Sequence, residues 1–100
     1  MWAFAAKESE LKDNQINAVY PKGIALILIK KEGKLFALSA VCSHMGCSLA
    51  GALLDDYIIQ CPCHDWRFDI RTGEFLDATE IKLATYKTRI QDGNVLVELQ

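Results

Sequence analysis

Two short stretches contain every cysteine and both histidines of this 100-residue chain. The first stretch carries Cys42 and His44 in the pattern C-x-H, and the second carries Cys61 and His64 in the pattern C-x-x-H. Sixteen residues separate His44 from Cys61. Thiolate and imidazole groups bind soft and borderline metals, and one of each in two separate stretches is a metal-ligand pattern. We therefore predict a metal site to which both stretches contribute.

The spacing of these ligands bears on which metal they bind. Two thiolates and two imidazoles could hold a structural zinc ion, but zinc modules usually leave two to four residues between neighbouring ligands, and only Ser43 separates Cys42 from His44. A 2Fe-2S cluster can instead be held by two Cys on one iron and two His on the other, one of each from either stretch. We predict one 2Fe-2S cluster and keep a structural zinc module as the alternative.

These patterns, with WRFD and then TG at residues 66–73, resemble the Rieske iron-sulfur family and in particular its soluble ferredoxins. The resemblance implies that Cys42 and Cys61 bind the inner iron and that His44 and His64 bind the outer one. It also implies an all-β fold, a Rieske-like antiparallel β-sandwich or barrel. Residues 1–100 would then form a single domain, with a small cluster-binding subdomain at approximately 42–76 inserted into the base sheet.

The other two cysteines, Cys47 and Cys63, fall where high-potential Rieske proteins carry a disulfide between the two cluster loops. The resemblance therefore implies a Cys47–Cys63 disulfide, and two buried thiols in a reducing cytosol are the alternative. Asp65 and Trp66 stand where that group has Gly and Ser. The family serine donates a hydrogen bond to a cluster sulfur, which stabilises the more negative reduced cluster. Its absence predicts a lower reduction potential.

Periodicity and turn signals predict the elements that would position these residues. Residues 48–56 and 77–80 are expected to be loops, and Ser9 or Asp13 is expected to cap a helical turn within residues 8–14. The dipeptide Asp92-Gly93 is the strongest hairpin signal in the chain. Strands are predicted at residues 2–6, 16–20, 24–29 (buried on both faces), 35–41, 57–60, 66–70, 74–76, 85–91 and 94–99.

Charge and hydropathy restrict the possible partners. The formal charge of −2 predicts neither nucleic acid nor an anionic membrane surface as a partner. The apolar start, residues 1–6, lacks the basic region of a signal peptide, and no apolar run reaches the length of a membrane span, so we expect a cytoplasmic protein without a membrane partner. Residues 55–80 contain seven Asp or Glu against two Arg, a balance of −5. This acidic side would attract a basic surface of a redox partner.

A cluster whose irons are fully ligated by protein has no open position for a substrate, so its chemistry is one-electron transfer. An oxygenase would need a second iron held by two further His, and this chain has none to spare. We therefore predict an electron-transfer protein, not an enzyme, that passes electrons from a reductase to an oxygenase or other terminal acceptor. The alternatives are the Rieske-like small subunit of a nitrite reductase complex, a redox sensor that uses Cys47 and Cys63, and the zinc module.

Overall fold

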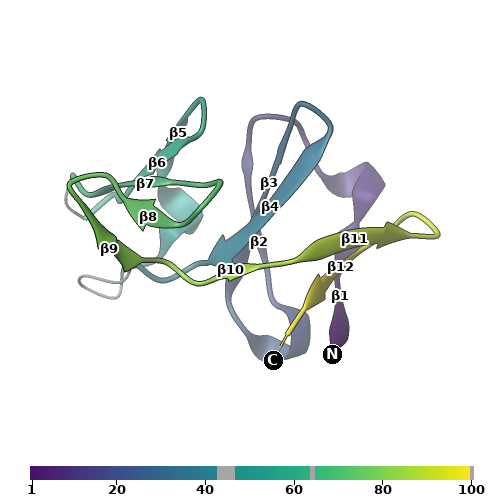
Figure 1. Cartoon of the computed structure of the whole chain (residues 1–100). Coiled ribbons are helices and arrows are strands. Elements are labelled where there is room, and N and C mark those ends of the chain that lie inside the picture. The colour runs from purple at the N-terminus through teal and green to yellow at the C-terminus, as the bar shows by residue number, and fades with distance from the viewer. Residues whose placement is uncertain (43–46, 64, 100) are drawn as a thin grey trace.

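Three antiparallel sheets make up the chain in the computed structural model, which describes residues 1–42, 47–63 and 65–99 (Figure 1). Within these ranges the helical elements are short 3-10 turns, and everything else that is regular is β-strand. The all-β antiparallel prediction is therefore confirmed. No helix in the described ranges has the length and apolar character needed to cross a membrane.

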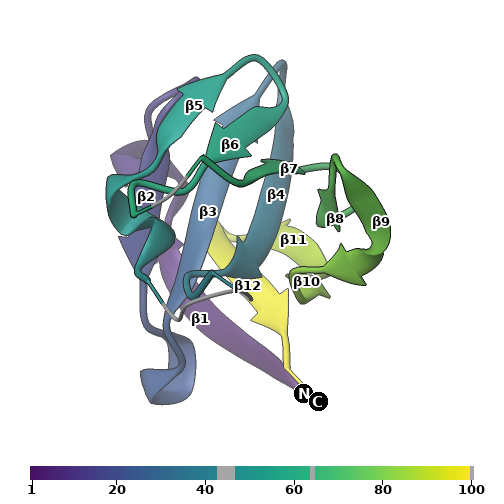
Figure 2. The same ribbon diagram turned by 90° about the vertical axis from the view of Figure 1, so that its left-hand side faces the viewer.

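The first sheet joins the two ends of the chain. Its strand order is β1 (Trp2–Lys7), β12 (Asn94–Glu98) and β11 (Thr88–Gln91). Figure 2, which looks onto the end of the molecule that carries β5 to β9, shows the two termini side by side. Asp92 and Gly93 both have positive φ, 54° and 78°, as the two-residue turn of a twisted hairpin requires. The predicted hairpin is confirmed.

The second sheet is buried on both faces at its centre. Its order is β10 (Thr85–Tyr86), β4 (Lys34–Ser39), β3 (Leu26–Lys31) and β2 (Ile16–Val19). Successive side chains of a strand point to opposite faces. Accordingly Ile27 and Ile29 belong to one core cluster, while Leu26 and Leu28 belong to another, packed against the first sheet. The predicted strand with two buried faces is confirmed.

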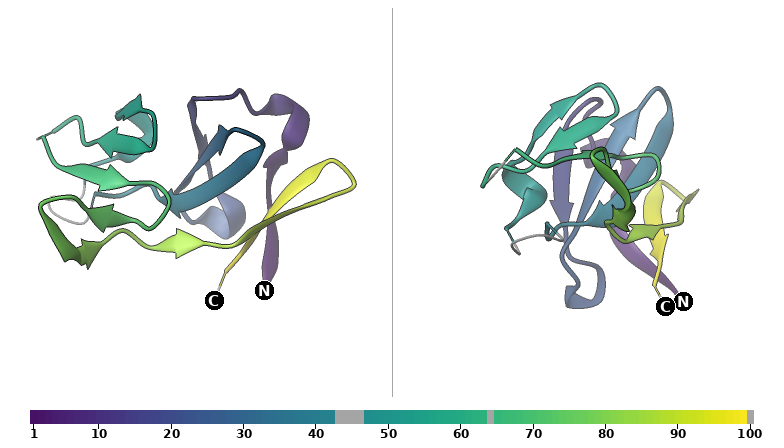
Figure 3. Two further views of the ribbon diagram at one scale, coloured as in Figure 1. Left: turned by 45° about the horizontal axis from the view of Figure 1, so that its top comes forward. Right: turned by 60° about the vertical axis from the view of Figure 1, so that its left-hand side comes forward.

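The third sheet is a meander of five short strands, β5 to β9, in sequence order (Figure 3). Two loop predictions are wrong here, because β5 lies within residues 48–56 and β9 includes residues 78–80. Both are edge strands of the meander, and most of their side chains are exposed or half-buried. They are strands because they pair with a neighbouring strand, and their sequences have no apolar alternation that would predict this. The bounds are β5 (Leu53–Asp55), β6 (Ile58–Gln60), β7 (Arg67–Asp69), β8 (Glu74–Phe75) and β9 (Ala78–Lys82).

Two smaller predictions also differ from the structure. The single strand expected at residues 85–91 divides at Lys87, because β10 pairs with β4 whereas β11 pairs with β12. The turn after β1 is a 3-10 helix, Glu8–Glu10, that has Lys7 at its N-cap and no side-chain cap, so the expected capping by Ser9 or Asp13 is wrong. The other 3-10 helices are Pro21–Gly23 and Leu49–Gly51.

The phenol ring of Tyr57 fastens the third sheet to the second. It lies 5.2 Å from the Lys31 ammonium and 4.6 Å from the Arg71 guanidinium, and it meets Phe36 edge-on with ring centroids 6.0 Å apart. Its hydroxyl donates a 3.0 Å hydrogen bond to Glu32, which raises the pKa of Tyr57 because the bond favours the neutral phenol. We call these contacts the Tyr57 clasp.

Gly73 is the glycine on which the third sheet depends most directly. Its φ is +81°, and a Cβ there would overlap the carbonyl oxygen of Leu83. The backbones of Gly73 and Leu83 lie this close because the Leu83 N–H donates a 2.8 Å hydrogen bond to the Gly73 carbonyl. A side chain at position 73 would therefore push the two segments apart.

We expect Gly73→Ala to lower the free energy of unfolding by about 3 kcal/mol or more, since backbone strain and steric overlap add. Gly93→Ala is the matched control. Its φ is +78° but nothing lies within 4 Å of the added Cβ, so it should cost only about 1–2 kcal/mol. Denaturant unfolding of both variants measures the difference, and equal costs would contradict the role given to the Leu83 contact.

Candidate metal centre

Strand alternation places Cys42 and Cys61 in one core. Along β4 and beyond, Leu38, Ala40 and Cys42 share a face and are 0%, 5% and 1% exposed, whereas Val41 between them is 45% exposed. On the other side Ile59 and Cys61 are 0% and 2% exposed. All these buried residues belong to the core cluster that lies between the second and third sheets. Two strands from different sheets thus deliver one thiol each to the same apolar interior.

The two cysteines also begin loops that close in the same way. The Cys42 N–H donates to the Cys47 carbonyl at 2.8 Å, and the Cys61 N–H donates to the Trp66 carbonyl at 2.9 Å. Each bond joins a residue to the fifth residue after it. The first loop is closed again by Leu49, whose N–H donates to the Ala40 carbonyl at 2.6 Å. Each thiol therefore sits at the fixed base of a six-residue loop.

A disulfide joins the two loops. Cys47 and Cys63 are bonded, with their Cα atoms 6.4 Å apart, as the resemblance to high-potential Rieske proteins implied. Cys63 is exposed and Cys47 is half-buried, in contrast to Cys42 and Cys61. The bond spans a sequence separation of 16 residues. In the chain-entropy account, closing a loop of that length stabilises the folded state by about 3 kcal/mol.

The two predicted imidazole ligands, His44 and His64, lie outside the described residues. Within the described ranges, no group of three or more His, Cys, Asp or Glu side chains is arranged to hold a metal ion. The two cysteine ligands, which the structure describes, have the chemistry that an iron-sulfur cluster requires. Cys42 and Cys61 are small soft donors in a dry apolar interior, which suits iron of an iron-sulfur cluster, since its ligands there are thiolates and water is excluded. The described half of the predicted ligand set therefore fits the cluster.

An aromatic stack supports the second loop. The indole of Trp66 lies parallel to the ring of Phe75, with centroids 3.9 Å apart and planes 9° from each other, and Phe68 tilts against both. Because the Trp66 carbonyl accepts the Cys61 N–H, the stack holds the end of the loop that Cys61 begins. The part played by Phe75 was missed in the sequence. The β7–β8 register, which pairs Phe68 with Phe75, is the signal that could have shown it.

The polar side chains near the second loop are mostly acidic. Asp65 is exposed and accepts a 3.0 Å hydrogen bond from the Gln60 amide, a contact that the sequence did not suggest. Farther along, the Arg71 guanidinium donates to Asp69 at 2.9 and 3.0 Å and so lowers the pKa of that carboxyl. Asp77 is exposed at the turn between β8 and β9. Asp65 and Asp77 thus place negative charge on the described surface near the second loop.

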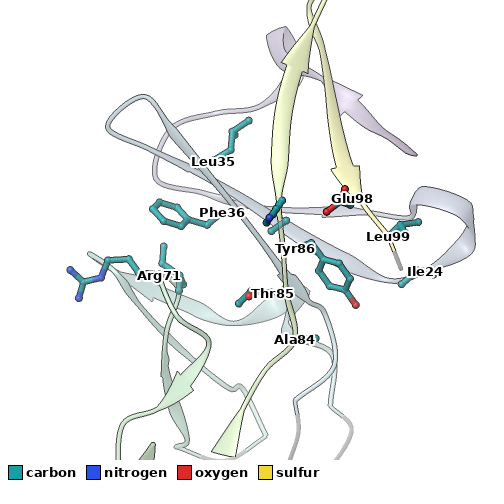
Figure 4. Close-up of a pocket in the computed structure, with 12 residues that line it drawn as sticks. Ile24, Leu35, Phe36, Arg71, Ala84, Thr85, Tyr86, Glu98 and Leu99 are labelled. Atoms are coloured by element: carbon teal, nitrogen blue, oxygen red, sulfur yellow. The ribbon is translucent and has the colours of Figure 1, made fainter. Parts of the chain in front are cut away.

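A groove of about 550 Å³ lies where β4 and β10 meet the end of the chain, and not at Cys42 or Cys61. Leu35, Phe36 and Tyr86 line part of it, and it extends to Arg71 and Leu99 (Figure 4). Cys42 and Cys61, the predicted ligands that the structure describes, are not among its lining residues. A cluster that is fully held by protein needs no substrate pocket, so the groove has no place in the predicted chemistry.

Comparison with known proteins agrees with this arrangement. The ferredoxin component of the naphthalene 1,2-dioxygenase system of Pseudomonas putida is 29% identical over 99 residues, which cover 98% of this chain and 95% of that protein. The solved structure of Sphingomonas yanoikuyae B1 ferredoxin superposes with a TM-score of 0.86 and 31% identity, covering 97% of both chains.

The same fold occurs within a larger protein. The terminal oxygenase of carbazole 1,9a-dioxygenase from Nocardioides aromaticivorans IC177 superposes with a TM-score of 0.89 at 24% identity, over 99% of this chain and 30% of the oxygenase. The family model described as the Rieske [2Fe-2S] domain matches residues 1–87. With its paired buried cysteines and its loop-to-loop disulfide, this chain belongs to the Rieske [2Fe-2S] domain family.

Proposed function

We propose that this chain is a one-electron carrier that holds a Rieske 2Fe-2S cluster through Cys42 and Cys61 on one iron and His44 and His64 on the other. One observation carries the proposal: two strands place one thiol each in a shared dry core, at the base of two loops that close alike. The cluster would supply one-electron redox chemistry. The domain would be residues 1–100, with a cluster-binding subdomain at approximately 42–76.

The role of a carrier, and not of an enzyme, follows from the ligand count. With two Cys and two His on the cluster, no histidine remains for a mononuclear catalytic iron. The relative from Pseudomonas putida is named as a ferredoxin component of a dioxygenase system and is covered almost end to end. We therefore propose a reductase as the electron donor, an oxygenase or another terminal acceptor as the recipient, and the cytoplasm as the location.

The ligand set is the first prediction to test. The purified protein should contain iron and acid-labile sulfide in equal amounts and give a Rieske-type EPR signal after reduction. Cys42→Ser and Cys61→Ser should each abolish that signal, because an inner-iron ligand is lost. Ser48→Ala, an exposed position beside the first loop, is the control and should keep the signal. Zinc without iron in the wild-type protein would refute the proposal.

The reduction potential gives a second prediction. Rieske centres span roughly −150 to +300 mV, and Trp66 in place of the serine donor predicts the lower half of that range. His44→Cys should lower the potential further, toward the roughly −400 mV of all-thiolate plant-type clusters, because an anionic ligand replaces a neutral one. Potentiometric titration with EPR detection measures both. A clearly positive wild-type potential would instead indicate a respiratory-like carrier.

The acidic surface gives a third prediction. If Asp65 and Asp77 attract a basic partner, the rate of electron transfer with the reductase should fall as salt rises, since the screening length is about 10 Å at 0.1 M. The double variant Asp65→Asn, Asp77→Asn should be slower at low salt and less sensitive to salt. Asp92→Asn, in the β11–β12 turn of the first sheet, is the control and should match the wild type. A wild-type rate independent of salt would exclude electrostatic attraction.

A further inference from the structure

We propose that the outer face of the first sheet is a self-association surface, on which Phe4 of each of two copies stacks on the Arg89 guanidinium of the other copy. The occupant of this face is therefore a second copy of the chain. The proposal stands on described residues of β1, β11 and β12, and it does not depend on the metal centre.

Strand alternation sorts the side chains of the first sheet onto two faces. Ala3, Val95 and Val97 are buried in the core cluster that this sheet shares with the second sheet. Trp2 and Phe4 alternate with Ala3, so they point to the opposite, outer face. The first sheet lies on the far side of the second sheet from β5 to β9 (Figure 1). Its outer face is therefore turned away from the cysteine loops.

The outer face carries aromatic rings on one strand and a cation on another. Arg89 of β11 pairs with Leu96 of β12, and Leu96 pairs with Phe4 of β1, so these three side chains form one row across the sheet. Phe4 is 53% exposed. Aromatic and Arg side chains are the ones enriched at protein interfaces and at their binding hot spots. The composition of this face is therefore that of an interface.

The Arg89 guanidinium lies over the Trp2 ring of its own chain, 4.4 Å from the ring centroid. A guanidinium is planar and can meet an aromatic ring on either of its two faces. Because Arg89 is exposed, the guanidinium face that is turned away from Trp2 is open to a second ring. Phe4 of a second copy would supply that ring and leave the cation between two aromatic side chains.

A half-turn brings two copies into this contact. Since β12 lies between β1 and β11, rotation about an axis parallel to β12 places β1 of one copy over β11 of the other. The contact between Phe4 and Arg89 is then made twice, as the two-fold symmetry of an isologous dimer requires. The exposed Asp65 and Asp77 belong to the part of the chain that carries β5 to β9, so the two acidic ends stay apart.

The charges on the outer face have both signs. Glu98 of β12 pairs with Trp2 on one side, and on the other side its N–H donates to the Lys87 carbonyl at 2.9 Å. The cations at positions 87 and 89 therefore have a carboxylate on the neighbouring strand. This neighbour limits the electrostatic repulsion between two copies of the face.

The dimer is expected to be weak because the face is small. Its strands are four to six residues long, and three strands about 4.8 Å apart give a footprint on the order of 300 Å². A standard interface buries about 800 Å² on each partner. We therefore expect a dissociation constant between about 10 μM and 1 mM.

Analytical ultracentrifugation of the purified protein tests the association over that range of concentration. The wild type should shift from monomer toward dimer as the concentration rises. Phe4→Ser and Arg89→Ser should each weaken association by about tenfold or more, because each removes both copies of the contact. Leu53→Ser is the matched control. Leu53 is 68% exposed on β5 of the third sheet, so this variant should associate like the wild type.

A swap of the two residues tests whether Phe4 meets Arg89 and no other group. Phe4→Arg would place a guanidinium against a guanidinium at both contacts, so this variant should stay monomeric. Arg89→Phe supplies a ring at position 89. An equimolar mixture of the two variants restores a ring opposite a cation at both contacts. The mixture should therefore form a mixed dimer at least about tenfold more tightly than Phe4→Arg associates with itself.

Three results would overturn the proposal. The first is a wild-type protein that is monomeric at every concentration, the second is a loss of association in Leu53→Ser as large as that in Phe4→Ser, and the third is a mixture that associates no better than Phe4→Arg alone. If circular dichroism shows that Phe4→Ser is unfolded, Arg89→Ser decides, since its side chain is exposed. The EPR tests of the proposed function are independent of all these outcomes.

Discussion

The burial of two thiols in one apolar core is the constraint on which the rest of this structure depends. Cys42 and Cys61 come from different sheets, and each is placed by the two-residue period of its strand. A shift of one residue in either strand would turn a cysteine to the surface and carry Val41 or its counterpart inward. The register of β3 with β4 and of β6 with β7 is therefore a condition for the chemistry as well as for the fold.

Several separate contacts hold the second and third sheets in this arrangement. The Tyr57 clasp joins the ends of the second and third sheets that are remote from the cysteine loops, through the contacts of Tyr57 with Glu32 and Lys31. The Trp66–Phe75 stack and the disulfide hold the loops themselves. These contacts act in different ways, since a cation–π contact is an electrostatic attraction to the ring and aromatic stacking buries apolar surface, while the disulfide acts chiefly on the unfolded chain. The third sheet, whose strands are two to five residues long, needs this support because little backbone pairing holds it.

The sequence predicted the fold class, the Cys47–Cys63 bond, the doubly buried strand and the Asp92-Gly93 hairpin, because each has a local or family signal. It missed β5 and β9, which are edge strands of the meander with few buried side chains, so no alternation marks them. The sequence analysis predicted one strand in place of β10 and β11, because residues 85–91 have the pattern of one extended run. The two strands are separate because β10 pairs with β4 and β11 pairs with β12, and this change of partner at Lys87 depends on tertiary structure. Phe75 and Gln60 were missed for the same reason, since their partners are set by strand pairing and loop closure.

The cysteine loops and the chain termini lie at opposite ends of an elongated molecule. The described chain measures 39 Å along its longest axis, and the termini lie at the first sheet, away from β5 to β9 (Figures 1 and 2). Electron transfer falls steeply with distance, so a useful partner must approach the end that carries the cysteine loops. That end also carries Cys63 and the exposed carboxylates of Asp65 and Asp77. The carboxylates that would attract a basic partner thus lie at the same end as the cysteine loops, so electrostatic attraction would bring the partner to the surface from which the distance for electron transfer is short.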